Sequence, residues 1–318
     1  MGLKDIAGIF SRFFVVGFFL PAFFSFLLLD RTLSSALLPD SYEAYTDGTR
    51  ILVLGGAALL AGLVLSGLHS PVLRLFEGYP LRRARDLPGF GHVYESLMRA
   101  REREFDAQVS IREQPTRSPA RTEAAQRLAR SYPSKREELL PTRLGNVIRS
   151  FERHPRSRYG LDGVVVWPRI ETFLAQEEHD LLSAAKADVA FFLNGAICLT
   201  AAAVALVAGA AATWGWGQLG VAAASLAVAT LLYRASVGAA YRWGVEVRSI
   251  FDVHRLELYE RMGLRRPGRE LRESDVARTL NRWLLYGEEP GVELRAKRGD
   301  DEENAGSYGS SGAWSKRA

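Results

Sequence analysis

The longest stretch without a charged side chain runs from Val189 to Tyr233 and contains 45 residues without Asp, Glu, Lys or Arg. A turn-like segment with two tryptophans and two glycines, Thr213 to Gln218, interrupts it. One membrane-crossing helix needs about 20 apolar residues, and backbone polar groups in lipid must be paired within the helix. The pattern therefore predicts two transmembrane helices joined by a tight turn.

Two further uncharged runs lie near the N-terminus, at Phe13 to Leu29 and at Ile51 to Leu68. Ser34 and Ala36 offer the small-x-small pattern of a signal-peptide cleavage site, but the first run is longer than a usual signal-peptide core, so we expect a retained span. The four runs together predict an all-α integral membrane protein with four transmembrane helices as two hairpins with long cytoplasmic helical extensions.

Charged and turn-forming residues divide the chain into six predicted segments, and Gly, Ser and charge dominate the last of them. The segments are a cytoplasmic N-terminus (1–12), a first transmembrane hairpin (13–75), a cytoplasmic helical block (76–185), a second transmembrane hairpin (186–243), a cytoplasmic helical extension (244–287) and a disordered tail (288–318).

Periodicity predicts the elements of the cytoplasmic segments. A helix is predicted from Gly91 to Val109, and a short buried strand or extended segment at Val164 to Trp167. Apolar residues recur at helical spacing from Ile170 with no breaker, so this helix is predicted to continue into the third span. A similar stripe predicts that the fourth span continues as a helix to Met262.

Positive charge flanks the same side of the predicted spans. Lys4 and Arg12 precede the first span, Arg74 follows the second and Arg234 follows the fourth, whereas the two intervening loops are acidic or uncharged. The positive-inside rule then places both termini in the cytoplasm of a multi-pass protein. The bias toward Arg, Ala and Gly fits a GC-rich bacterial genome, so we expect the bacterial cytoplasmic (inner) membrane.

The chain carries a net charge of +5 and has 36 arginines against 5 lysines. Next to membrane spans, such a balance indicates contact with the lipid bilayer and its anionic headgroups rather than with nucleic acid.

The densest polar cluster follows Pro141. Four of its residues, Arg143, Asn146, Arg149 and Arg153, recur three or four positions apart and share one face of a predicted helix. Guanidinium groups bind phosphate or carboxylate bidentately, which predicts a site for anionic headgroups. The alternative is a solvated face whose arginines pair with Glu152 and Asp162. The candidate anion- or lipid-binding residues are Arg143, Asn146, Arg149, Arg153, Arg156, Arg158 and Arg169.

No residue pattern indicates catalysis, a cofactor or a metal. Cys198 is the only cysteine and the five histidines lack the spacing of metal ligands. A Ser-His-Asp arrangement, a phosphate-binding glycine loop and a dinucleotide fingerprint are absent from the sequence. We therefore predict a protein that is not an enzyme and has no metal site.

The spans themselves carry no residue typical of a proton or ion relay, which disfavours ion-coupled transport. Hydrophobic constrictions can gate a pore, and the phenylalanine-rich first span offers one in an oligomer; the alternative is that these side chains face lipid. The candidate constriction residues are Phe18, Phe19, Pro21 and Phe23. Small residues predict a tight interface between the third and fourth spans: Ala201, Ala205 and Gly209 on one, Ala223 and Ala227 on the other.

Several short motifs carry a resemblance: Arg74 to Tyr79, Arg143 to Asn146, Arg158 to Asp162, Val165 to Arg169 and Phe251 to Arg255. With them, residues 10 to 287 resemble a group of uncharacterised bacterial four-span membrane proteins, and this resemblance implies no particular activity. The order of two spans, a helical block, two spans and a cytoplasmic tail is similar, in layout only, to bestrophin-type anion channels.

Two functions follow as hypotheses. The first is an oligomeric inner-membrane protein forming a channel or pore for small ions, with copies of itself as partners. The second is a membrane-anchored scaffold or signalling subunit that binds anionic lipid or a protein partner through its Arg-rich cytoplasmic block.

Overall fold

A computed structural model describes residues 11–33, 45–113, 123, 126, 130–213, 215–269, 271–291 and 294 of the 318-residue chain. The described residues form helices and connecting turns, without a β-strand among them. The predicted tail from residue 295 onward and the first ten residues lie outside this description. The chain divides into two compact units: unit 1, Met1–Phe151 with Ala175–Val247, and unit 2, Glu152–Leu174 with Arg248–Ala318.

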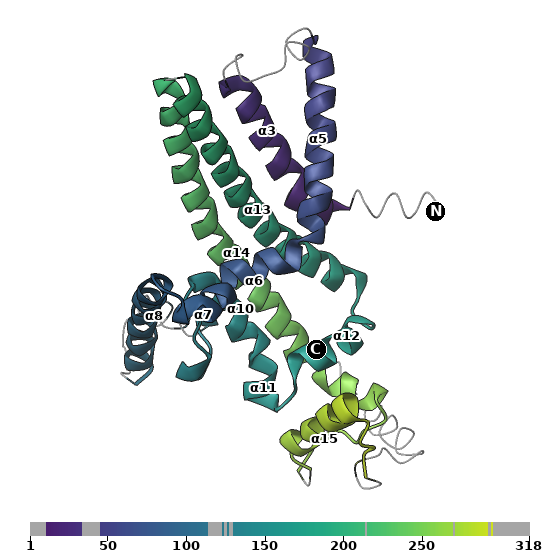
Figure 1. Cartoon of the computed structure of the whole chain (residues 1–318). Helices are drawn as coiled ribbons and strands as arrows, with labels where there is room; N and C mark the ends of the chain where they lie inside the picture. Colours follow the sequence, from purple (N-terminus) through teal and green to yellow (C-terminus); the bar gives the residue numbers. More distant parts are fainter. Residues whose placement is uncertain are drawn as a thin grey trace, which may run out of the picture. The chain divides into compact units, whose positions relative to one another are not determined.

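Four helices are long and apolar enough to cross a membrane, which confirms the four apolar helices predicted from the sequence (Figure 1). The first is continuous from Arg12 to Thr32 and is built from α2 (Arg12–Phe14), the π-helical turn η1 (Val15–Phe19) and α3 (Leu20–Thr32). The others are α5 (Asp47–Gly67), α13 (Gln176–Thr213) and α14 (Trp216–Arg261).

Pro21 follows the π-helical turn of the first helix by two residues. Pro21 has no N–H to donate to the carbonyl of Gly17 four residues before it. The buried side chain of Asn194 on α13 donates its amide to that carbonyl at 2.7 Å. A freed carbonyl in an apolar surrounding needs such a partner, so this bond fixes the register between α13 and the first helix.

Close helix contacts in unit 1 depend on small residues. A Cβ at Gly62 of α5 would lie 3.3 Å from the backbone of Phe19, and one at Gly195 of α13 would lie 2.9 Å from a methyl group of Leu232 on α14. Near the other end of these helices, Ala203 and Leu206 of α13 pack against Ala222 of α14.

The small residues that are buried in α13 and α14 are mostly not the ones predicted for the interface between the third and fourth spans. Ala201, Ala223 and Ala227 are exposed in the structure, whereas Gly209 is buried. Alanines one or two positions away face the interior instead: Ala202, Ala203, Ala222 and Ala229. Because alanines occur at nearly every turn of both helices, the pattern does not show which of them face the partner helix.

Short helices follow α5 in unit 1. They are α6 (His69–Glu77), α7 (Tyr79–Arg83) and the 3-10 turn η3 (Ala84–Asp86), and they lead into the predicted charged helix, α8 (Phe90–Glu113). After the 3-10 turn η4 (Arg136–Glu138), α10 (Arg143–Glu152) packs four apolar residues, Leu144, Val147, Ile148 and Phe151, in the interior.

Unit 2 contains α11 (His154–Tyr159), α12 (Gly163–Glu171), the last turns of α14 and α15 (Glu273–Tyr286). The prediction of a strand at Val164 to Trp167 was wrong. Asp162 accepts the N–H of Val165 at 3.4 Å and starts a helix, so a run of β-branched residues is helical here. Pro168 lies inside α12, which is tolerated because Val164, whose carbonyl loses its donor, is 74% exposed.

The predicted cytoplasmic extension is present in the fourth span helix, α14, but is interrupted before the third, α13. The fourth continues to Arg261, one residue short of the predicted Met262. The third does not begin near Ile170: α12 ends at Glu171, and α13 starts at Gln176 after a short turn. Glu178 accepts the N–H of Ala175 at 3.0 Å, which is a capping interaction that marks a new helix start.

Candidate anion-binding site

The seven arginine and asparagine residues predicted as one site are divided between the two units. Three of them, Arg143, Asn146 and Arg149, belong to unit 1, and the other four belong to unit 2. The surroundings of each residue are therefore given within its own unit, and the single site stays a prediction.

Asn146 has a structural role. Its side chain is buried, accepts the N–H of Leu140 at 2.9 Å and donates to the carbonyls of Leu140 and Thr142 at 2.7 and 2.8 Å. These bonds hold the chain that leads into α10. Both donors of the amide, and its oxygen, are thus bonded to the backbone.

Arg143 is held by an acidic partner. Its guanidinium group lies 2.6 Å from Glu104 on α8, and Arg101 and the hydroxyl of Tyr132 bind the same carboxylate. Burial acts to raise the pKa of Glu104, but the hydrogen bonds from Arg143 and Tyr132 and the charge of Arg101 outweigh it and lower that pKa. Burial and the bond to Glu104 raise the pKa of Tyr132. This network joins α8 to α10.

The arginines of unit 2 have partners within the protein. Arg156 lies 3.8 Å from Asp162, the acidic partner that the sequence suggested, and Arg169 donates to the carbonyl of Val165 at 2.7 Å. Arg158 interacts with Tyr159 and Asp252, and Arg153 also has partners. The printed partners of Arg156, Arg158 and Arg169 all lie within unit 2.

Arg149 leads to a different part of unit 1. Its Nη1 donates to the hydroxyl of Tyr79 at 3.3 Å, and Tyr79 forms part of a hollow of about 460 Å³ at α7 and η3. The lining residues are Tyr79, Arg82, Arg83, Arg85 and Asp86. We call this feature the basic hollow.

The local sequence explains why the chain turns sharply enough to form the basic hollow. Gly78 has φ +89°, a conformation that favours glycine, and a Cβ there would lie 2.5 Å from Pro141. A Cβ at Gly145 would overlap the carbonyl of Glu77, so α6 ends directly against the start of α10. Pro80 then suits the first turn of α7.

The basic hollow carries an uncompensated positive charge. Arg82 and Arg83 are exposed, and their guanidinium groups have no acidic partner among the residues that the structure describes. Arg85 pairs with its neighbour Asp86 at 3.3 Å. Three arginines against one aspartate leave a net charge of +2 within the lining.

Large apolar side chains are exposed directly after the basic hollow. Leu87 is 56% exposed, and Phe90 and Val93, one turn apart on α8, are each 51% exposed. Gly91 packs close to the carbonyl of Arg85, which places the start of α8 against η3. Arginines beside exposed leucine, phenylalanine and valine are typical of a surface that lies at a membrane interface.

Sequence reasoning did not single out Arg82, Arg83 and Arg85, and so it missed this site. The available signal was their position: three arginines in four residues, after a Gly-Tyr-Pro turn and a short amphipathic segment that directly follows a span. Such a segment is expected at a membrane surface.

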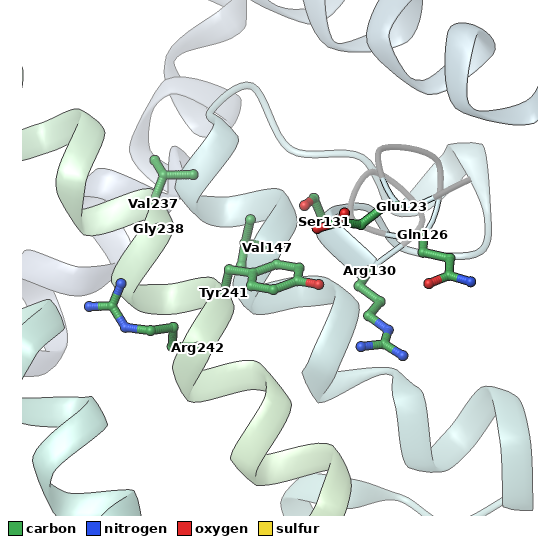
Figure 2. Close-up of a pocket in the computed structure, with 9 residues that line it drawn as sticks. All are labelled: Glu123, Gln126, Arg130, Ser131, Val147, Val237, Gly238, Tyr241 and Arg242. Carbon is green, nitrogen blue, oxygen red and sulfur yellow. The ribbon is translucent and has the colours of Figure 1, made fainter. Parts of the chain in front are cut away.

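A second cavity of about 600 Å³ in unit 1 lies between α14, α10 and residues before α10 (Figure 2). Figure 2 shows Tyr241 turned toward Arg130, while Arg242 points away and pairs with Asp188 at 3.3 Å. Its charged lining residues, Glu123, Arg130 and Arg242, are of both signs. Because Asp188 pairs with Arg242, the other two charges, Glu123 and Arg130, balance each other, and the cavity lacks the uncompensated charge of the basic hollow.

The candidate constriction residues lie within the packing of a single chain. Phe18 is fully buried against Phe14 and Ala190, and Pro21 is also buried. Phe19 and Phe23 stack on each other at 5.7 Å and are partly exposed. Phe24 is the exposed member of this run, at 55%.

Comparison with protein-family models, curated proteins and solved structures found no match for this chain. The resemblance to bacterial four-span proteins and the bestrophin-like layout stay predictions from the sequence. The function has to be argued from the site itself.

Proposed function

We propose that the chain is a four-span protein of the bacterial inner membrane that holds its helical cytoplasmic part at the membrane surface by binding anionic lipid headgroups. It acts as a membrane-anchored scaffold or signalling subunit. The observation that carries this proposal is the basic hollow, with its net charge of +2 and its exposed apolar neighbours.

The proposed membrane arrangement is two hairpins with both termini in the cytoplasm. Support comes from exposed arginines close to the ends of three uncharged runs: Arg12 as the first residue of α2, Arg74 in α6 after α5, and Arg234 directly after the uncharged run that ends at Tyr233 within α14. Positive residues near span ends remain in the cytoplasm. In this arrangement α6 and α7 directly follow a span on the cytoplasmic side, where the inner leaflet presents its anionic lipids.

The test is the stabilisation of the purified full-length protein in neutral detergent by added short-chain lipids. A ligand that binds only the folded state stabilises it by about 2.7 kcal/mol at a hundredfold excess over Kd. We expect dioctanoyl phosphatidylglycerol to raise Tm by several degrees and dioctanoyl phosphatidylcholine to have a much smaller effect. The double variant Arg82→Gln/Arg83→Gln should lose most of the difference between the two lipids.

Arg269→Gln is the matched control, because Arg269 is exposed, lies in unit 2 and has no acidic partner among the described residues. It should respond to lipid as the wild type does. Equal stabilisation by the anionic and zwitterionic lipids would contradict the proposal. So would an unchanged lipid preference in the double variant.

An oligomeric pore is the second candidate, favoured by the exposed small residues of α14. Gly220, Ala223 and Ala227 are exposed and lie three or four positions apart, a spacing that permits close contact between helices in lipid. Current across a planar bilayer, together with the size of the detergent-solubilised particle, tests this candidate. A monomer without conductance would exclude it.

A further inference from the structure

The basic hollow brings three guanidinium groups together from only four consecutive residues. Arg82 and Arg83 end α7, and η3 turns the chain so that Arg85 also lines the hollow. Like charges at this density repel one another, and Asp86 offsets one of them through its ion pair with Arg85. The remaining arrangement is complementary to an anion.

The charge of the hollow indicates what kind of anion balances it. A phosphodiester, as in most phospholipids, carries one negative charge and would leave one positive charge uncompensated. A phosphomonoester carries about −1.5 to −2 at pH 7 and offers three terminal oxygens. Since each guanidinium presents a planar fork of N–H donors, three terminal oxygens suit three arginines better than two do.

The size and surroundings fit a lipid headgroup. The volume of about 460 Å³ falls within the roughly 300 to 1,000 Å³ that is usual for small-ligand sites. Arg149 contacts the wall through Tyr79 and adds a further positive charge beside the hollow. The exposed side chains of Leu87, Phe90 and Val93 are suited to contact the acyl region next to the headgroup.

We infer that the basic hollow prefers a dianionic phosphomonoester, as presented by phosphatidic acid, over the monoanionic phosphodiester of bulk phospholipids. This inference rests on the proposed function, because it specifies which anionic headgroup the surface binds. The same phosphate chemistry is also presented by a soluble phosphomonoester, so the experiment includes both sources.

The experiment measures binding to the purified full-length protein in neutral detergent with two probes of identical acyl chains. Dioctanoyl phosphatidic acid is the phosphomonoester, and dioctanoyl phosphatidylmethanol is the matched phosphodiester. At pH 7.5 we expect about tenfold tighter binding of phosphatidic acid, the effect of one additional charge-assisted interaction. Inorganic phosphate and methyl phosphate are tested alone: binding as tight as that of phosphatidic acid would overturn the assignment to a lipid headgroup, and much weaker binding supports it.

A pH series separates charge recognition from a structural effect. The second pKa of a phosphomonoester is about 6, so phosphatidic acid becomes a monoanion as the pH falls to 5. The preference over phosphatidylmethanol should therefore disappear at pH 5, while the affinity for phosphatidylmethanol stays constant. A preference that persists at pH 5 would overturn the inference.

Arg83→Gln should reduce the preference for phosphatidic acid several-fold, and Arg269→Gln should leave it unchanged. The Tm of each variant without lipid shows that the fold is retained. Equal affinity of wild type for both anionic probes would overturn the inference and leave the proposed function standing. If neither probe binds more tightly than dioctanoyl phosphatidylcholine, the proposed function fails as well.

Discussion

Asn194 and Pro21 show how a single residue can require another one far away in the sequence. Pro21 leaves the carbonyl of Gly17 without its helical donor, and Asn194 supplies the missing bond from α13 at 2.7 Å. The two residues should therefore be energetically coupled through this carbonyl, although they belong to different helices.

Replacing Asn194 by alanine should destabilise the protein by about 1 kcal/mol, because a buried carbonyl loses its donor. In a Pro21→Ala background the loss should be smaller, since the introduced alanine brings an N–H that can bind the Gly17 carbonyl. Reversible unfolding of the wild type, both single variants and the double variant in mixed micelles measures the coupling. Additive effects of the two substitutions would contradict this account.

Two glycines of α14 offer a contrast on one helix. A Cβ at Gly238 would meet no atom within 4 Å, because Gly238 borders the second cavity (Figure 2), whereas a Cβ at Gly244 would lie 2.5 Å from the ring of Phe151. Gly238→Ala should stabilise the protein by about 0.5 to 1 kcal/mol through helix propensity. Gly244→Ala should destabilise it by about 1 to 3 kcal/mol through overpacking.

Thermal unfolding of these two variants and the wild type measures both shifts. Each variant serves as the control for the other, since the substitution and the helix are the same. Shifts of the same sign would show that glycine flexibility, rather than the local packing, decides the outcome.

At the scale of elements, Glu104 joins α8 to α10, and its pKa gives this contact a pH dependence. A carboxylate whose pKa is lowered by folding stabilises the protein above its unfolded pKa, 4.5, and this stabilisation is lost as the pH falls through the lowered value. Glu104→Gln should therefore lower Tm by a few degrees at pH 7, and the difference from the wild type should shrink below about pH 4.

Tm measured from pH 7 to pH 3 tests this expectation. Glu95→Gln on the same helix is the control, because the exposed Glu95 lies 4.0 Å from Arg99 and contributes little. A difference between wild type and Glu104→Gln that stays constant over the whole range would contradict the assignment of the stabilising charge to Glu104.

The sequence was informative where one strong signal dominated. Four uncharged runs predicted four apolar helices, and the stripe ending at Met262 predicted the C-terminal end of α14 within one residue. It failed where two signals competed. Val164 to Trp167 has a strand composition, but the cap at Asp162 makes it helical, and the turn before Gln176 has no proline or glycine to reveal it.

The candidate site was less predictable because its anions and cations come from distant parts of the chain. The sequence places Arg143 and Arg149 on one helix face, but only the fold shows that Glu104, 39 residues earlier, neutralises the first and that Arg149 reaches Tyr79, 70 residues earlier. Arg82 and Arg83 stand out because neither has an acidic partner among the described residues. Periodicity along one helix shows neither which distant residue pairs with an arginine nor which arginine has no acidic partner.

At the scale of the whole molecule, the proposed function requires that the basic hollow, Arg12 and Arg234 lie on the cytoplasmic side of the membrane. Cysteine labelling can test this orientation, because Cys198 is the only native cysteine and Cys198→Ala provides a background without thiols. Asp47 at the start of α5 and Gly217 at the start of α14 are exposed positions for the outer side. Arg103 on α8 is an exposed position for the cytoplasmic side.

In spheroplasts, a membrane-impermeant maleimide should label Asp47→Cys and Gly217→Cys but should label Arg103→Cys only after the membrane is disrupted. The expectation follows from the arginines that flank the helices on one side, since positive residues near span ends are retained in the cytoplasm. A membrane-permeant maleimide, which should label all three variants, is the control for thiol accessibility. Labelling of Arg103→Cys in intact spheroplasts would place α8 outside the cell, where the basic hollow could not meet the inner leaflet, and the proposed function would have to be abandoned.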